Sequence, residues 1–173
     1  MIDFGICADV RRTGIGAKIA LVPNARDIAD VLDVINHFKP TLFHGVPALY
    51  NAINNHESVK AGKVDLKSIR YCISGSAPLP PSTKAEFEKL SGAKLSEAFG
   101  MSEAPTGVTC NPLRGENRTG SIGLPFPDVD VKIVSLDDGK TEIAIGDIGE
   151  LILRGEKKQE KEEKGDNYYV AER

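Results

Sequence analysis

A hydroxyl and a carboxylate stand side by side near the middle of the chain. Residues 95–103 (LSEAFGMSE) indicate a short strand that ends at Gly100, and Ser102 and Glu103 follow it. Mg²⁺ bound together with a nucleotide usually takes one or two carboxylates besides phosphate oxygens and waters. One glutamate beside a phosphate-binding hydroxyl would therefore suffice, and Phe99 offers an apolar face for a purine. A serine cap followed by a surface acid is the simpler interpretation of the pair, and the spacing alone leaves both open.

Two glycine-rich runs could approach the same ligand. Residues 74–79 (SGSAPL) follow another strand-like segment, and residues 120–125 (GSIGLP) come later. The backbone at Gly75 can come close to the edge of a base because glycine has no Cβ. Open α/β sheets bind ligands at the carboxyl ends of neighbouring parallel strands. We therefore expect residues 74–79 and 95–103 to form one site for a nucleotide and Mg²⁺.

The elements around these turns predict how they are positioned. Apolar runs predict strands at residues 18–22, 41–45, 68–74 and 94–99. Apolar spacing and start signals predict helices at residues 27–38, from Pro47, and from Pro80 to Leu90, while residues 57–67 are expected to form a polar loop. The order βαβαβαβ is typical of an α/β fold, with a parallel sheet and flanking helices.

The chain changes in character after Glu103. Glycine and proline recur without helical spacing as far as residue 128, and residues 129–134 then alternate between apolar and polar. A turn at residues 137–139 and a strand at 150–154 would complete a small antiparallel β subdomain. The predicted division is an α/β subdomain at 1–128, a β subdomain at 129–155 and a charged linker or truncated tail at 156–173, in which residues 168–170 could form a last strand.

Composition excludes several classes of function. A formal net charge of −3 gives no reason to expect a nucleic-acid partner. Three widely spaced cysteines, Cys7, Cys72 and Cys110, suit neither a disulfide framework nor a zinc site and fit a reducing compartment. No apolar run approaches the roughly 18 residues of a membrane span, and the first residues lack the pattern of a signal peptide. We therefore predict a cytoplasmic protein.

Taken together, these motifs resemble those of the ATP-dependent adenylate-forming superfamily: acyl-CoA synthetases, firefly luciferase and the adenylation domains of peptide synthetases. Its Tyr-Gly-x-Thr-Glu signature stands here as Phe99-Gly100-Met101-Ser102-Glu103. Further matching segments follow the order of the superfamily, at residues 40–50, 74–79, 120–125 and 146–151, and the resemblance spans about residues 18–155. The chain is most similar to long-chain fatty acyl-CoA synthetases, as residues 45–47, 51–53 and 110–112 indicate.

The resemblance implies roles for individual residues. Those that would bind the ATP or AMP cofactor are Gly75, Ser76, Ala77, Pro78, Glu97, Ala98, Phe99, Gly100, Met101 and Ser102. Ser102 would contact the α-phosphate and Glu103 would hold Mg²⁺, so these two are the candidate catalytic residues. The substrate pocket would include His44, Gly45, Thr106 and Gly107, although a partly buried histidine bonded to backbone is the simpler interpretation of His44.

Parts of the superfamily pattern are not found in this sequence. The phosphate loop that ends in a lysine would precede residue 1, and the C-terminal domain with its catalytic lysine would follow residue 173. We therefore expect the chain to be the central part of a ligase and to be inactive in isolation. The intact enzyme would form acyl-AMP from a fatty acid and ATP, and would then transfer the acyl group to coenzyme A.

Two alternatives stay open. Another acid could be the substrate, such as acetate, an aryl acid or an amino acid. A non-catalytic remnant could instead serve as a binding or dimerisation module, which a homodimer would support. Peripheral membrane contact by the intact enzyme is compatible with the sequence.

Overall fold

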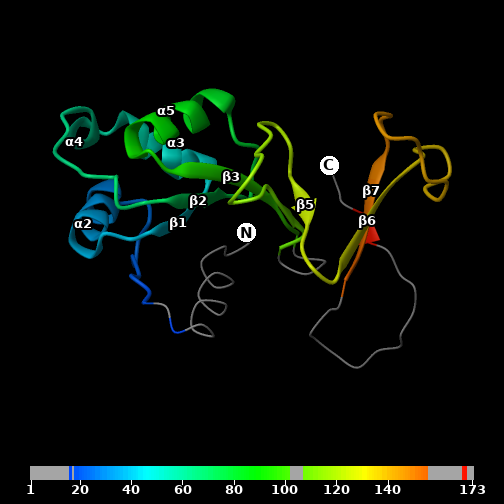
Figure 1. The fold of residues 1–173 in the computed structure, drawn as a ribbon, viewed down its shortest axis with the longest axis horizontal. Coiled ribbons are helices and arrows are strands. Elements are labelled where there is room, and N and C mark those ends of the chain that lie inside the picture. The colour runs from blue at the N-terminus through cyan, green and yellow to red at the C-terminus, as the bar shows by residue number, and fades with distance from the viewer. Residues whose placement is uncertain (1–15, 17, 102–106, 156–168, 171–173) are drawn as a thin grey trace.

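Two sheets organise the chain, as Figure 1 shows. The computed structural model describes residues 16, 18–101, 107–155 and 169–170, and of the last pair only the backbone. The five strands of the first sheet lie in the order β1 (Leu42–Gly45), β2 (Tyr71–Ser74), β3 (Lys94–Phe99), β4 (Thr109–Cys110) and β5 (Leu124–Pro125). The second sheet contains β6 (Val129–Val134), β7 (Glu150–Gly155) and β8 (Tyr169–Val170).

Local capping signals fix the ends of helix α2 (Ile28–Phe38), as the sequence predicts. The Asp27 side chain accepts a hydrogen bond from the Asp30 amide at 3.3 Å, which satisfies one free N–H of the first turn. At the other end Lys39 adopts φ 48° and donates its N–H to the Ile35 carbonyl, before Pro40 ends the helix.

Prolines start the two helices that cover the first sheet. Pro47 opens α3 (Pro47–Asn55) and Pro81 opens α5 (Pro81–Ser91), and Gly92 ends α5 at φ 71°. Figure 1 shows α3 and α5 side by side over one face of β1–β3. The loop predicted at residues 57–67 is wrong in its first part, because α4 (Glu57–Lys60) forms there with the His56 ring as its cap.

Three strands of the first sheet are parallel and two are antiparallel. Strands β1, β2 and β3 pair in parallel, while β4 and β5 extend the sheet from β3 in antiparallel fashion. The predicted α/β class, with a sheet and flanking helices, is confirmed, but the prediction of four parallel strands is wrong. Residues 18–22 form no strand, and Leu21 is 72% exposed. An apolar run becomes a strand only where a neighbour pairs with it, and the sequence of the run cannot supply that neighbour.

The main core lies between the sheet and its helices. Its largest fully buried side chains include Tyr50 of α3 and Phe87 of α5, whose rings meet edge to face at 4.8 Å. The Tyr50 hydroxyl donates a hydrogen bond to the Ile73 carbonyl at 2.9 Å and lies 3.3 Å from the Phe43 carbonyl. Tyr50 therefore joins α3 to the strands beneath it.

The second sheet is antiparallel, as predicted for residues 129–155. Strand β6 pairs with β7 along its whole length, and β8 adds the last strand expected near residues 168–170. The predicted turn at residues 137–139 is confirmed: Asp138 accepts hydrogen bonds from the Lys140 and Thr141 amides, both at 2.9 Å. After this turn, Glu142 forms an isolated antiparallel bridge with Val134 of β6 before β7 begins.

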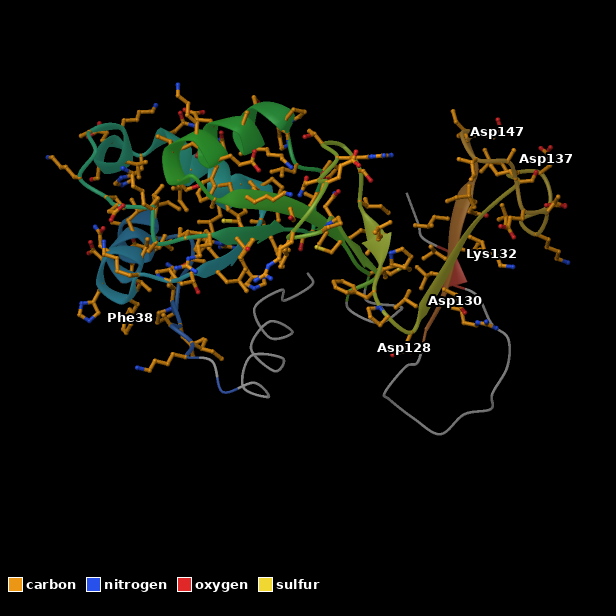
Figure 2. The ribbon with its side chains drawn as sticks, viewed as in Figure 1. Phe38, Asp128, Asp130, Lys132, Asp137 and Asp147 are labelled. Atoms are coloured by element: carbon orange, nitrogen blue, oxygen red, sulfur yellow. The ribbon has the colours of Figure 1, made fainter. Side chains whose placement is uncertain are left out.

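Exposed charged side chains stand on β6 and in the loops that flank it. Figure 2 shows Asp137 and Asp147 at its outer loops, and Asp128 and Asp130 at the end nearer the first sheet. Asp130 pairs with Arg154 of β7 at 2.8 Å across the two strands. Among the described residues, no helix has the length and apolar character needed to cross a membrane.

Candidate functional site

The carboxyl ends of the three parallel strands place the predicted site residues in one row. Gly45 of β1, Ser74 of β2 and Glu97 of β3 are register partners. Because side chains alternate along a strand, His44 and its partners Ile73 and Ser96 belong to the opposite face. The structure thus brings Gly45, the start of the Ser74–Leu79 motif and Glu97 to a single edge of the sheet.

Residues 75–79 follow β2 at this edge, and we call them the exposed turn because its three middle residues are exposed. Gly75 is buried, whereas Ser76, Ala77 and Pro78 are exposed. Ser76 has φ 69°, a left-handed conformation that non-glycine residues seldom adopt. Ser74 precedes the turn with no exposure, and its Oγ has no hydrogen-bond partner among the described residues.

Glu97 contacts the exposed turn directly. Its Oε1 accepts a hydrogen bond from the Leu79 amide at 3.2 Å, across a sequence separation of eighteen residues. The sequence predicts both segments as parts of one site, and this bond joins them. The sequence alone does not reveal that Glu97 Oε1 and the Leu79 amide are the two atoms that meet.

The end of β3 turns toward a second hydrophobic cluster. Ala98 and Met101 are each 9% exposed, and Phe99 is half-buried. Met101 packs with Val108 and Leu153, and Phe99 lies against the same group. Phe99 therefore packs against other side chains, and its role toward a purine stays a prediction, as do the roles of Gly100 and Met101.

The remaining predicted residues divide into two groups. Ser102, Glu103 and Thr106 lie outside the described residues, so their roles as phosphate, metal and substrate contacts stay predictions. For Gly45 and Gly107 the structure gives a packing reason. A Cβ at Gly45 would lie 3.1 Å from Tyr50 Cε2, and one at Gly107 would lie 3.0 Å from Phe126 Cε2.

Residues 111–117, which the sequence does not assign to the site, form hydrogen bonds with Glu97 and its neighbour Ser96. We call these contacts the brace. The Asn111 amide donates to the Glu97 carbonyl at 2.9 Å, and Asn111 Oδ1 accepts from the Arg118 amide at 3.1 Å. Asn117 Nδ2 donates to Ser96 Oγ at 2.9 Å, while Asn117 Oδ1 accepts from the largely buried Lys84 ammonium. The only sequence signal for this brace is that Asn111 falls within the family-like segment 110–112.

Neither described thiol is suited to act as a nucleophile. Burial, with the negative charge of Glu88 nearby, raises the pKa of Cys72 to about 12. Burial also raises the pKa of Cys110. Since the thiolate is the reactive form, covalent catalysis by these two cysteines at neutral pH is disfavoured.

Comparison with known proteins decides the family. The AMP-binding enzyme family matches residues 4–158 of the chain. The chain belongs to the AMP-binding enzymes. A long-chain-fatty-acid–CoA ligase of Bacillus subtilis (strain 168) is 40% identical over 141 residues, which are 82% of this chain and 24% of that protein. The chain thus spans about a quarter of the length of the curated relatives that it matches.

Solved structures of AMP-forming ligases share the fold. The anthranilate CoA ligase AuaEII, in complex with anthranoyl-AMP, is 32% identical with a TM-score of 0.72, over 82% of this chain and 27% of that one. ATP-bound MatB from Rhodopseudomonas palustris is 26% identical with a TM-score of 0.73, over 86% of this chain and 28% of that one. The predicted resemblance to adenylate-forming ligases and to long-chain fatty acyl-CoA synthetases is confirmed.

The described residues of this AMP-binding enzyme fit an adenine nucleotide. The exposed turn offers backbone groups at the edge of the sheet, where α/β folds bind such ligands. The buried Ser74 hydroxyl, without a partner among the described residues, adds a polar atom at the base of the turn. Membership of the family supports binding of ATP or AMP.

Proposed function

We propose that the chain is the central part of an ATP-dependent, AMP-forming fatty acid–CoA ligase. The observation that carries the proposal is the exposed turn, bonded to Glu97 above the carboxyl ends of three parallel strands. The names of the relatives supply the substrate class, because curated proteins similar to this chain are long-chain-fatty-acid–CoA ligases.

We assign the nucleotide to the edge of the sheet at the exposed turn. Gly75, Ser76, Ala77 and Pro78 contact adenine, and the segment from Glu97 to Met101 lies beside the base. Ser102 binds the α-phosphate and Glu103 holds Mg²⁺. A bound Mg²⁺ ion would neutralise phosphate charge, which otherwise opposes the approach of a carboxylate.

The acid is proposed to approach from the β1 side and from residues 106–107. His44, Gly45, Thr106 and Gly107 would line its pocket. The intact enzyme would join the carboxylate to AMP and then form the thioester with coenzyme A. The likeness to an anthranilate CoA ligase favours an aryl acid as the second candidate substrate.

Organisation and location complete the proposal. We propose subdomains at residues 1–128 and 129–155, with residues 156–173 as a linker or tail. A cytoplasmic location suits the fatty acid, ATP and coenzyme A as small-molecule partners. Dimerisation is the alternative role, and exposed apolar side chains in the connection between β6 and β7, Leu136, Ile145 and Ile148, favour it. Size-exclusion chromatography tests that alternative, since a monomer at all concentrations speaks against it.

Nucleotide titration is the direct test of the site. AMP added to the ¹⁵N-labelled chain should shift the amide signals of Gly75, Ser76 and Glu97, while GMP serves as the matched control. Pro78 has no backbone N–H and therefore gives no amide signal. Unchanged signals with AMP, in a folded chain, would contradict the proposal.

Acid-dependent exchange between ATP and pyrophosphate tests activity and substrate. With Mg²⁺ and short, medium or long fatty acids, or anthranilate, we expect no exchange by the isolated chain. Exchange that depends on one acid would name the substrate and would overturn our expectation that this part alone is inactive.

A further inference from the structure

The exposed turn is fixed at both ends by hydrogen bonds to different strands. At its start the Gly75 amide donates to the Gly45 carbonyl of β1 at 3.3 Å. At its end the Leu79 amide donates to Glu97 Oε1 of β3 at 3.2 Å. The Leu79 side chain is itself buried in the main core. The turn is therefore held across the ends of all three parallel strands.

The conformation of the turn needs this support. Ser76 adopts φ 69°, which a non-glycine residue keeps only where its surroundings impose it. Ser76, Ala77 and Pro78 are exposed, so packing around them contributes little. Among the described contacts, the two terminal hydrogen bonds and the buried Leu79 side chain thus hold the ends of the turn.

Glu97 is well placed to act as a fixed support. Its backbone carbonyl accepts from the Asn111 amide at 2.9 Å, and its neighbour Ser96 accepts from Asn117 at 2.9 Å. Asn117 is bound in turn by the Lys84 ammonium, and Lys84 is only 8% exposed. The carboxylate therefore projects from a strand that is held at the Glu97 backbone and at the neighbouring Ser96 side chain.

We propose that Glu97 is a positioning residue, whose carboxylate holds the exposed turn in the conformation that receives adenine. The inference rests on the proposed function, because it assigns the turn to the nucleotide. A carboxylate oxygen and an amide oxygen both accept a hydrogen bond, so this role requires an acceptor and no charge. A direct ionic contact with the ligand would require the charge.

Three substitutions separate these possibilities. Glu97→Ala removes the acceptor, and Glu97→Gln keeps it without the charge. Glu88→Ala is the matched control, since Glu88 Oε1 accepts from the Leu95 amide at 2.9 Å, the same kind of bond to β3 away from the turn. Should Glu97→Ala fail to fold, Glu97→Met removes the acceptor and keeps the length of the side chain.

Two measurements on the 173-residue chain follow these variants. Hydrogen exchange by NMR reports the protection of the Leu79 amide without any ligand, and AMP titration reports the dissociation constant. Glu97→Ala should lose the protection and weaken AMP binding about tenfold, the usual effect of losing one such bond. Glu97→Gln should keep most of the Leu79 protection and most of the AMP affinity. Glu88→Ala should leave this protection and this affinity at the wild-type level.

Each other outcome has a distinct meaning. Wild-type affinity in Glu97→Ala, with Leu79 unprotected, would overturn the inference and leave the proposed function standing. Weak binding by Glu97→Gln with Leu79 protected would also overturn it, in favour of a charge contact. Failure of the wild-type chain to bind AMP would overturn the proposed function, and the positioning role with it, whatever the exchange of Leu79 shows.

Discussion

At the scale of single residues, the Cys72 thiol should make the free energy of unfolding vary with pH in the alkaline range. Burial, with the charge of Glu88 nearby, raises the pKa of Cys72 to about 12, whereas an exposed thiol has a pKa of about 8.5. Between these values the folded chain keeps the proton and the unfolded chain releases it. The free energy of unfolding should therefore fall by about 2 kcal/mol from about pH 8 to pH 10 because of this thiol.

Urea unfolding at the two pH values measures this dependence. Cys72→Ala should remove most of the fall, while Cys110→Ala, at a less buried thiol, should keep most of it. An equally steep fall in Cys72→Ala would show that other groups cause it. Tyr50 is the first of these to consider, because burial also raises its pKa.

At the scale of elements, Gly123 is required for β4 and β5 to meet. It has φ 88°, and a Cβ there would lie 2.1 Å from the Asn111 amide nitrogen. Gly123→Ala should lower the free energy of unfolding by at least about 2–3 kcal/mol, because backbone must move to relieve the clash. Gly120→Ala is the control: φ is 80° there, but no atom lies within 4 Å of the added Cβ.

Thermal or urea unfolding of the two variants decides the point. Gly120→Ala carries only the conformational strain, and should cost about 1 kcal/mol. Equal losses in both variants would mean that strain alone governs the position, and that the close approach of β4 to residue 123 is not rigid.

Local chemistry explains which elements the sequence predicts correctly. The helices α2, α3 and α5 begin and end at caps and prolines that lie inside the segments themselves. Strands β4 and β5 each have two residues. They form because β4 pairs with the edge of β3 and β5 pairs with β4, so no local sequence pattern predicts them. The run at 18–22 has the pattern of a strand and lacks a partner among the described residues.

The same distinction applies to the site. Its motifs identify the exposed turn and Glu97, since residue types and order are properties of the sequence. The bond from Leu79 to Glu97, the left-handed Ser76 and the brace from Asn111 depend on segments brought together by folding. Sequence reasoning therefore names candidate residues for the site, which stay predictions, and misses the contacts between the segments that carry them.

At the scale of the whole molecule, a small cluster joins the two sheets. Leu153 of β7 is fully buried against Met101 and Val108, which belong to the region of the first sheet. Leu153→Ala should therefore cost about 2–4 kcal/mol. Ile148→Ala, at a side chain that is 87% exposed, is the control and should change stability by less than about 0.5 kcal/mol.

The position of this cluster makes a stronger expectation possible. Met101 directly precedes Ser102, and Phe99 of β3 packs against the same group. A cavity at Leu153 should therefore disturb amide signals of Phe99 and Val108 as well as those of β6 and β7. Changes confined to β6 and β7 would show that the sheets move independently, with a true domain boundary near residue 128. Changes on both sides would mean that the second sheet supports the end of β3, where the proposed phosphate and metal residues begin.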